Sequence, residues 1–339
     1  LAKLRTEAAP MPLTEVRAAV ENELGAPLTE LFSTFDEAPL GSASIAQAHR
    51  ATLKSGESVV VKVQRPGIYE TMEQDIALLR RAAGLLKLAA GTGETIDFSL
   101  VLDELWAVSQ QEMDFLREAA NAEEFYQRNE GVAFASCPKI YRAFTTRHVL
   151  TMEYIDGFSP DDLEALDRAG YDRAEIAAKL ADNYIKQIVD DGFFHADPHP
   201  GNLRIRGGQI LWIDLGMMGR LSPRDQKLLG EAVRAISRHD VDAMRRVLLA
   251  LGQPKGPVDH AQINADIDAL LSRYAETDLE SVSMPQLLDD VLVLAKRHGI
   301  ALPPGMSMLA RGLSTIEGVV VALDPHFNIM RATAAHISR

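Results

Sequence analysis

The stretch from His195 to Gly216, HADPHPGNLRIRGGQILWIDLG, constrains the fold of this chain more than any other segment. Asp197 and Asn202 lie five positions apart, and the prolines and glycine between them favour a stiff loop over a helix. Asp214 follows at the exit of a predicted β-hairpin. The two strands of that hairpin flank a Gly-Gly turn and are Leu203–Arg206 and Gln209–Ile213. One hairpin can therefore aim Asp197, Asn202 and Asp214 at a single point.

The three polar side chains of this stretch suit a metal–nucleotide complex. Mg²⁺ prefers oxygen ligands, taken from one or two carboxylates together with phosphate oxygens. Protein kinases meet that need with a catalytic-loop Asp, an Asn five residues later, and the Asp of a D-F-G motif. Each motif alone is common, and a D-L-G after a strand is often only a turn. Their order across one hairpin, directly after His195, nevertheless favours a kinase-like site.

The composition limits the classes of protein to which the chain can belong. Its 339 residues, 47% of them hydrophobic, suggest two domains or one large bilobal unit with a real core. The net charge of −13 argues against a nucleic-acid-binding surface. The single cysteine, Cys137, excludes an internal disulfide framework. We find neither an apolar run of transmembrane length nor a signal peptide, so we expect a soluble, cytoplasmic chain.

A phosphate-binding arrangement is predicted near the start of the chain. Lys62 interrupts the β-branched strand Val59–Val63, and a lone lysine in a strand usually faces solvent. Here it lies one strand after a loop of small residues, where kinases place the cover over the phosphates, so Lys62 would neutralise the α- and β-phosphates. That loop consists of Gly41, Ser42, Ala43 and Ser44. It has one glycine where a kinase loop has several, and we expect a stiffer cover that holds nucleotide in a different pose.

Two long helices are predicted after this strand. The first covers Glu70–Ala90, and the second is capped by Asp97 or Ser99 and runs to about Phe125. The second carries three acidic residues, which on a helix usually form a solvated face. They are Glu112, Asp114 and Glu118. A kinase needs one helix glutamate to pair with the strand lysine, and we assign that role to Glu118.

A candidate hinge follows these helices. Cys137–Phe144 and His148–Glu153 are predicted to form a strand pair. The next residues turn toward polar sequence at Glu153 and Tyr154, whose backbone would bind an adenine edge. The end of a simple hairpin is the alternative interpretation.

The other predicted elements are helices. The N-terminal helix Leu13–Leu24 ends at Gly25, as at a glycine C-cap, and a short helix covers Leu28–Phe32. Six amphipathic helices are expected in the second half of the chain: Ala174–Asp191, Pro223–Ser237, Asp240–Leu251, Ala261–Tyr274, Met284–His298 and Met306–Leu323. We therefore predict an N-lobe over residues 1–153 and a mostly helical C-lobe over residues 154–339.

Six segments of the chain resemble the signatures of the UbiB/ADCK (aarF-domain-containing) atypical kinase family. They are PLGSASIAQAHRA, VVVKVQRPG, QEMDFLREAANAEEF, MEYIDG, HADPHPGN and WIDLG. The resemblance extends over nearly the whole chain. It implies an α+β, bilobal, protein-kinase-like fold, with a small β-containing N-lobe that carries extra helices and with an alanine-rich nucleotide loop.

The resemblance also implies roles for individual residues. Lys62 and Glu118 would form the lysine–glutamate pair, and Asp197 would be the catalytic-loop aspartate. Asn202 and Asp214 would hold Mg²⁺. The pair Glu112 and Asp114 matches the family's ExD motif, which helps close an inhibitory N-terminal extension over the active site.

Two departures from the family pattern are evident. Nothing between Leu1 and Met11 matches the family's KxGQ motif, and the transmembrane helices that many bacterial relatives carry after the final helix are not found. Both suggest a chain trimmed from a longer protein. We expect the full-length protein to associate with the cytoplasmic face of the membrane, with membrane lipid or membrane-bound biosynthetic enzymes as partners.

The leading hypothesis is an ATP-binding, Mg²⁺-dependent atypical kinase or ATPase. Its place in isoprenoid-quinone or related lipid metabolism is implied by the resemblance alone. A small-molecule phosphotransferase of the aminoglycoside or choline kinase type is an alternative, since HADPHPGN nearly matches the H-G-D-x-H-x-x-N loop of those enzymes. A nucleotide-sensing scaffold without turnover is a third interpretation.

Overall fold

The computed structural model describes residues 8–90, 98–275 and 283–337. These residues form two compact units. The N-terminal unit comprises Leu1–Gln127, Cys137–Ile155 and Asp214–Gly216, and the C-terminal unit comprises Arg128–Ser136, Asp156–Ile213 and Met217–Arg339. Compared with the predicted division after residue 153, residues 128–136, 154–155 and 214–216 lie in the other unit.

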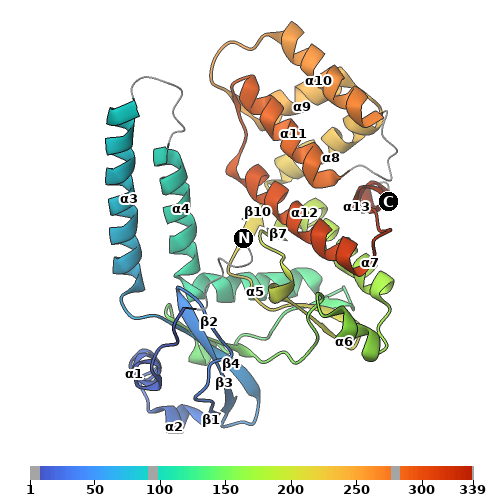
Figure 1. Cartoon of the computed structure of the whole chain (residues 1–339). Coiled ribbons are helices and arrows are strands. Elements are labelled where there is room, and N and C mark those ends of the chain that lie inside the picture. Colours follow the sequence, from blue (N-terminus) through green and yellow to red (C-terminus); the bar gives the residue numbers. More distant parts are fainter. Residues whose placement is uncertain (1–7, 91–97, 276–282, 338–339) are drawn as a thin grey trace. The chain divides into compact units, whose positions relative to one another are not determined.

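A five-stranded antiparallel sheet forms the centre of the N-terminal unit (Figure 1). Its strands are β1 (Phe32–Phe35), β2 (Gly41–Ser42), β3 (Ala46–Leu53), β4 (Ser58–Gln64) and β6 (Val149–Glu153). They are ordered β1-β3-β4-β6, with β2 paired to β3. The predicted strand around Lys62 is confirmed, and the turn before it uses a positive φ of 101° at Gly56.

The helices of this unit are α1 (Leu13–Leu24), α2 (Leu28–Leu31), α3 (Ile68–Ala90), α4 (Phe98–Glu112) and α5 (Phe115–Asn129). Helices α1 and α2 pack on one face of the sheet and α5 on the other, whereas α3 and α4 lie side by side and project away from the sheet (Figure 1). The side chains of Val59, Val61 and Val63 pack in one cluster with α1 and α2. Val60 packs in a second cluster with Phe115 of α5. Because strand side chains alternate between faces, Lys62 shares the face of Val60 and is directed toward α5.

One predicted helix of the N-terminal unit is in fact two helices. The expected helix to about Phe125 breaks between α4 and α5, at Met113 and Asp114. Tertiary contacts outcompete helix continuation there: the Gln64 side chain donates to the Met113 carbonyl (2.9 Å), and the Phe115 amide donates to Arg147 O (3.0 Å). The suggested cap Asp97 and the predicted break at 91–93 lie outside the described residues.

The predicted strand Cys137–Phe144 is also wrong. Only an isolated bridge, Ile140 to Met152, joins this segment to β6, and Arg142–Phe144 form a 3₁₀ turn, η2. The hydroxyl of Thr145 donates to Tyr141 O (3.0 Å) and accepts from the Thr151 amide (3.2 Å). Such side-chain bonds compete with a regular ladder.

The C-terminal unit is mostly helical. Its helices are α6 (Leu163–Arg168), α7 (Arg173–Val189), α8 (Pro223–Ser237), α9 (Val241–Leu251), α10 (His260–Ala275), α11 (Met284–Arg297), α12 (Pro304–Leu323) and α13 (Ile329–Ile337). The six helices predicted in this half are confirmed. Capping fits their sequences, because Ser222, Asp240 and Ser283 each accept an amide hydrogen bond at a helix start. Helices α6 and α13 were not predicted.

Short strands frame the HADPHPGN loop in this unit. They are β5 (Ala135–Ser136), β7 (Phe193–His195), β8 (Leu203–Arg206), β9 (Gln209–Trp212) and β10 (Met218–Arg220), with β11 (Gln253–Pro254) and β12 (Ile300–Ala301) farther along the chain. The predicted β8–β9 hairpin is confirmed, and both turn glycines, Gly207 and Gly208, have positive φ. Strand β7 pairs with β10, so the loop starts from a strand and ends in a hairpin.

One helix corrects the expectation that no segment reaches transmembrane length. Gly305–Leu323 of α12 is long and apolar enough to cross a membrane, with a mean hydropathy of 1.4. Half of this window is buried inside the protein, and a core helix passes the same test. Its sequence therefore gives only weak evidence for a membrane span.

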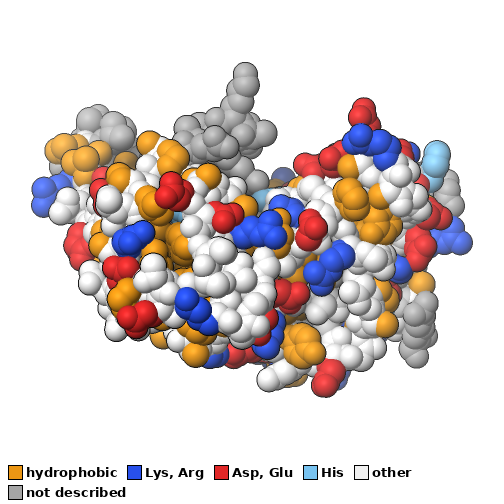
Figure 2. All heavy atoms as spheres, turned by 90° about the horizontal axis from the view of Figure 1, so that it is seen from below, with side chains coloured by type: hydrophobic (Ala, Val, Ile, Leu, Met, Phe, Trp, Pro, Cys, Tyr) orange, Lys and Arg blue, Asp and Glu red, His pale blue; other side chains and the backbone are white. Residues whose placement is uncertain are grey.

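Charges of both signs are mixed on the molecular face shown in Figure 2. Lys and Arg side chains there are scattered among Asp, Glu and hydrophobic side chains. The absence of nucleic-acid binding stays a prediction from the net charge.

Candidate functional site

The predicted lysine–glutamate pair forms in the N-terminal unit. Lys62 Nζ of β4 lies 2.6 Å from Glu118 Oε1 in the first turn of α5 and 3.0 Å from Asp214 Oδ2. Glu118 is 7% exposed, so the pair is largely removed from water. The structure thus confirms the choice of Glu118 over Glu112 and Asp114 as the partner of Lys62.

The charges around Lys62 shift two pKa values. Burial lowers the pKa of Lys62, but the carboxylates of Asp214 and Glu118 outweigh it and hold this pKa above its usual value. Burial raises the pKa of Glu118 to about 7, against the opposing effect of Lys62. Two carboxylates thus share one ammonium group, and the cluster is suited to accept a further cation near Asp214.

The D-L-G turn is held against α5 by its backbone. The Gly216 amide donates to Asp214 Oδ1 (3.1 Å), and the Asn121 side chain donates to Leu215 O (2.9 Å). Asn121 was not predicted as a site residue, although it lies three positions after Glu118 and hence on the same helical face. That spacing was the available signal.

The small-residue loop is tied down by one arginine. The Arg65 guanidinium donates to Ala43 O (2.9 Å), Ser42 Oγ (2.7 Å) and Ala9 O (2.9 Å). The Ala43 amide donates to Ala46 O (2.8 Å), so both backbone polar groups of Ala43 are engaged. Gly41 and Ser42 are paired in β2 rather than free in a loop, whereas Ala43 and Ser44 are exposed.

Other predicted residues of this unit have local partners. The amides of Glu153 and Tyr154 donate to Lys139 O (2.8 Å) and Ser58 O (3.0 Å), so adenine recognition there would fall to other backbone groups. Asp114 caps α5 by accepting from the Leu116 amide (3.1 Å). Glu112 is the last residue of α4. The function of this acidic pair stays a prediction.

Hydrogen bonds hold the HADPHPGN loop of the C-terminal unit in a fixed conformation. The Asp197 amide donates to His195 Nδ1 (3.1 Å), and the Asn202 side-chain nitrogen donates to Asp197 O (3.0 Å). Because the nitrogen of Asn202 is used in this way, its Oδ1 is the atom suited to a cation. The Ile213 amide donates to Asn202 O (2.9 Å), which ties the loop to the residue before Asp214.

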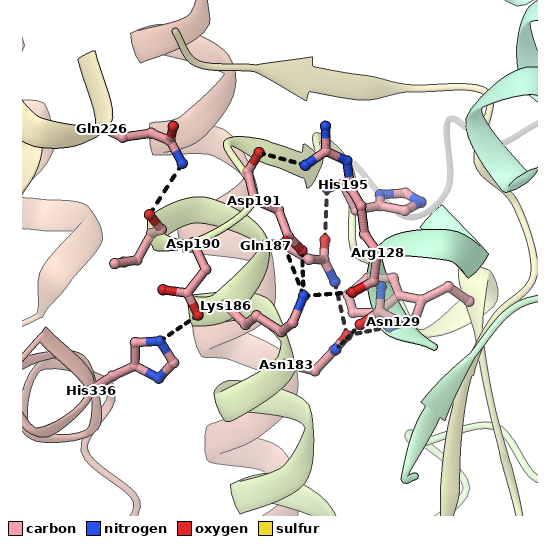
Figure 3. A network of polar contacts seen from close by, with 12 residues as sticks. Arg128, Asn129, Asn183, Lys186, Gln187, Asp190, Asp191, His195, Gln226 and His336 are labelled. Carbon is pink, nitrogen blue, oxygen red and sulfur yellow. Dashed lines mark hydrogen bonds and ion pairs between the residues drawn. The ribbon is translucent and has the colours of Figure 1, made fainter. Parts of the chain in front are cut away.

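A buried polar network of α7 holds the start of this loop (Figure 3). Gln187 accepts from the His195 amide (3.0 Å) and donates to Asn183 Oδ1 (3.0 Å), while Asn183 donates to Asn129 Oδ1 (2.7 Å). The Tyr184 hydroxyl donates to His195 O (2.8 Å). Asn183 and Gln187 are fully buried. From the sequence they were predicted only as part of an amphipathic helix, without a role at the site.

The donor chemistry of the predicted metal residues fits Mg²⁺. Asp214 offers a carboxylate and Asn202 an amide oxygen, and Mg²⁺ is commonly completed by phosphates and water. Among the residues that the structure describes, no three His, Cys, Asp or Glu side chains gather as a metal site by themselves. The convergence of Asp197, Asn202 and Asp214 on one point stays a prediction, because Asp214 lies in the N-terminal unit and the other two in the C-terminal unit.

The chain has a protein-kinase-like fold. A small sheet-containing part carries the paired lysine, and the helical part that follows carries the HADPHPGN loop. Sequence comparison agrees: the family described as "ABC1 atypical kinase-like domain" matches residues 3–248, and "UbiB helical domain" matches residues 267–328. The chain belongs to the ABC1/UbiB atypical kinase family. The resemblance seen in its motifs is thereby confirmed.

Individual relatives support this assignment. A Clostridium pasteurianum protein, "Uncharacterized protein in hydrogenase 1 5'region", is 36% identical over 97% of this chain, and the "Probable protein kinase UbiB" of Marinobacter nauticus is 32% identical over 97%. The chain covers 62% and 61% of these two relatives' lengths. A Mycobacterium tuberculosis protein, solved in complex with erythromycin, has a TM-score of 0.68 and 26% identity, over 96% of this chain and 82% of its own.

Proposed function

We propose that this chain binds ATP together with Mg²⁺ and transfers or hydrolyses its γ-phosphate, as an atypical kinase or ATPase. The observation that carries the proposal is the cluster of Lys62, Glu118 and Asp214, in which a partly buried lysine is held between a helix carboxylate and the D-L-G carboxylate. Phosphoryl transfer depends mainly on positioning and on the neutralisation of phosphate charge.

The residues would divide the work as follows. Lys62, oriented by Glu118, would offset charge on the phosphates. Asp197, on the rigid HADPHPGN loop, would orient a hydroxyl group or a water molecule toward the γ-phosphate. Asn202 and Asp214 would hold Mg²⁺, which when bound supplies further neutralisation of phosphate charge.

Nucleotide binding is tested with Asp214→Asn. Loss of this carboxylate should weaken Mg–ATP binding by roughly 100-fold, or about 3 kcal/mol, because a charge-assisted contact to the metal is lost. Calorimetric titration of Mg–ATP measures the effect. Asp161→Asn is the matched control, because it removes an exposed carboxylate that belongs neither to the cluster around Lys62 nor to the HADPHPGN loop. Equal affinity in wild type and Asp214→Asn would overturn the assignment of Asp214.

Turnover separates the proposed reaction from the alternatives. Phosphate release without an added acceptor would indicate an ATPase. ADP formation without phosphate release, dependent on one member of a panel of aminoglycosides, choline and erythromycin, would favour a small-molecule phosphotransferase. The macrolide is included because the M. tuberculosis relative was solved with it. Tight Mg–ATP binding with no ADP formation under any condition would favour a nucleotide-sensing scaffold.

We also propose, from the family resemblance, that the full-length protein supports isoprenoid-quinone or related lipid metabolism. Quinone content in cells that lack the protein should fall, and wild type but not Asp214→Asn should restore it. Normal quinone content in such cells would contradict this pathway without affecting the assignment of nucleotide binding.

A further inference from the structure

An apolar cavity of about 120 Å³ lies inside the C-terminal unit. Helices α7, α8, α9, α11, α12 and α13 each contribute side chains to its wall. Representative lining residues, one from each helix in that order, are Ile185, Ala232, Met244, Met284, Met306 and Ile337. The cavity is partly open, and both buried and partly buried side chains line it. Protein interiors are packed at the density of organic crystals, so a space of this size among apolar side chains calls for an explanation.

The wall of this cavity offers almost only carbon and sulfur atoms. Two lining residues, Gln226 and Thr333, have polar side chains, and both donate to backbone oxygens. Gln226 Nε2 donates to Val189 O (3.1 Å), and Thr333 Oγ1 donates to Ile329 O (2.8 Å). None of the lining residues is titratable. A polar ligand would lose its hydrogen bonds to water here, whereas a hydrocarbon would exchange water for close contacts.

The position of the cavity is typical of a ligand site. Part of its wall belongs to the segment matched by the kinase-like domain and part to the segment matched by the helical domain. Ligand cavities occur preferentially between helices and where domains meet. Helix α13 supplies Thr333 and Ile337 to the wall. It is linked to Asp190, the residue directly after α7, by a hydrogen bond between His336 Nε2 and Asp190 Oδ2 (2.9 Å; Figure 3).

We propose that this cavity binds an uncharged hydrocarbon group of about the size of a benzene ring. Apolar cavities of roughly 150 Å³ stay dry and take up benzene, because the wall regains contacts that an empty space forfeits. The cavity and its ligand class follow from the packing of the C-terminal unit alone. The proposal is therefore independent of nucleotide binding.

Methionine methyl NMR provides a direct test on the whole chain, with benzene as the probe. Met244, Met284 and Met306 line the cavity, whereas Met113 and Met152 are buried in the N-terminal unit. Benzene should shift the signals of the first three in a saturable manner and leave the other two unchanged. No saturable shift, or equal shifts of all five signals, would overturn the proposal.

Two matched variants test the available space. Ala232→Leu adds a side chain into the cavity, so it should abolish the benzene-induced shifts while the melting temperature is maintained or raised. Ala181→Leu makes the same change at a fully buried position of α7 outside the cavity wall and should lower the melting temperature. If Ala232→Leu lowers it as much as Ala181→Leu, or leaves the benzene response intact, the cavity is not the binding site.

Discussion

Glu118 is the residue whose environment departs most from its sequence expectation. A glutamate paired with lysine usually has a lowered pKa, yet burial and the nearby Asp214 raise the pKa of Glu118 to about 7. The pairing therefore does not by itself stabilise the fold near neutral pH. The cluster is arranged for a cation that it must receive from outside.

This arrangement predicts a distinctive pH dependence of stability without nucleotide. The pKa of Glu118 is raised from 4.5 in the unfolded chain to about 7 in the folded protein, so the folded protein binds this proton more tightly. Its contribution to stability is fully present below pH 4.5 and is lost as pH rises through about 7. Glu118→Gln should remove up to about 3 kcal/mol of that loss between pH 5 and 8. Denaturant unfolding at several pH values measures it.

Glu123 on the same helix is the matched control. Its hydrogen bond to Arg142 lowers the pKa of Glu123, which gives a dependence of opposite sign. Glu123→Gln should therefore keep the wild-type loss of stability toward pH 8. The same slope in wild type and Glu118→Gln would show that Glu118 is ionised throughout this range.

Arg65 is expected to control the nucleotide loop although no sequence pattern points to it. Its guanidinium holds Ala43 O and Ser42 Oγ, so Arg65→Ala should loosen the loop and change the ratio of ATP to ADP affinity by about 3- to 10-fold. Ala43→Gly should shift the ratio in the same direction by widening the allowed backbone conformations. Competition binding with ATP and ADP measures both variants.

Arg17→Ala on the exposed face of α1 should leave this ratio unchanged. If Arg65→Ala and Ala43→Gly also leave it unchanged, the loop is a structural connector without influence on nucleotide.

Elements with a clear period were predictable, and those defined by tertiary contacts were not. Strand β4 was found from its run of β-branched residues, and the amphipathic helices of the second half were found because apolar residues repeat along them. The break at Met113–Asp114 depends on Gln64 and Arg147, which are distant in sequence. Strands β7 and β10 have three residues each, too few for a period to be seen.

The same limit applies to the candidate site. Lys62, Glu118 and Asp214 could be predicted because an unusual residue type stands at a defined place in a strand, a helix or a turn. The polar residues Asn183 and Gln187 on α7 could not, since a polar residue on an amphipathic helix usually faces water. Here these two side chains are buried and hold the backbone of His195.

Helix α12 is predicted to support the HADPHPGN loop at Gly312, where the lack of a side chain leaves room for Tyr184. A Cβ at Gly312 would overlap the hydroxyl of the buried Tyr184, which donates to His195 O. Gly312→Ala should therefore destabilise the protein by about 1 to 3 kcal/mol and reduce ATP turnover more than ATP binding. Thermal unfolding and steady-state kinetics measure the two effects.

Gly318 of the same helix is the control, because a Cβ there meets no atom within 4 Å. Gly318→Ala should raise stability by up to about 1 kcal/mol through helix propensity. Equal effects of the two substitutions would mean that α12 does not support the loop through Tyr184.

At the scale of the whole molecule, the candidate residues are divided between two units. Lys62, Glu118 and Asp214 belong to the N-terminal unit, and Asp197 and Asn202 to the C-terminal unit. The proposed chemistry needs all five, so one Mg–ATP molecule would have to engage both units. Each unit has its own core, and nucleotide would add a link that neither core supplies.

Hydrogen exchange measured by mass spectrometry tests this link. At about 100 times the Kd, a ligand suppresses opening of the state that it binds by roughly 100-fold, or about 2.7 kcal/mol. Mg–ATP should therefore slow exchange in β4 of the N-terminal unit and in β7 and the following loop of the C-terminal unit. Removal of Mg²⁺ with EDTA, or Asp214→Asn, should reduce the protection of both segments together, because both depend on the same bound complex. Protection confined to β4 would show that nucleotide binds the N-terminal unit without the HADPHPGN loop, and Asp197 would then lose its proposed role.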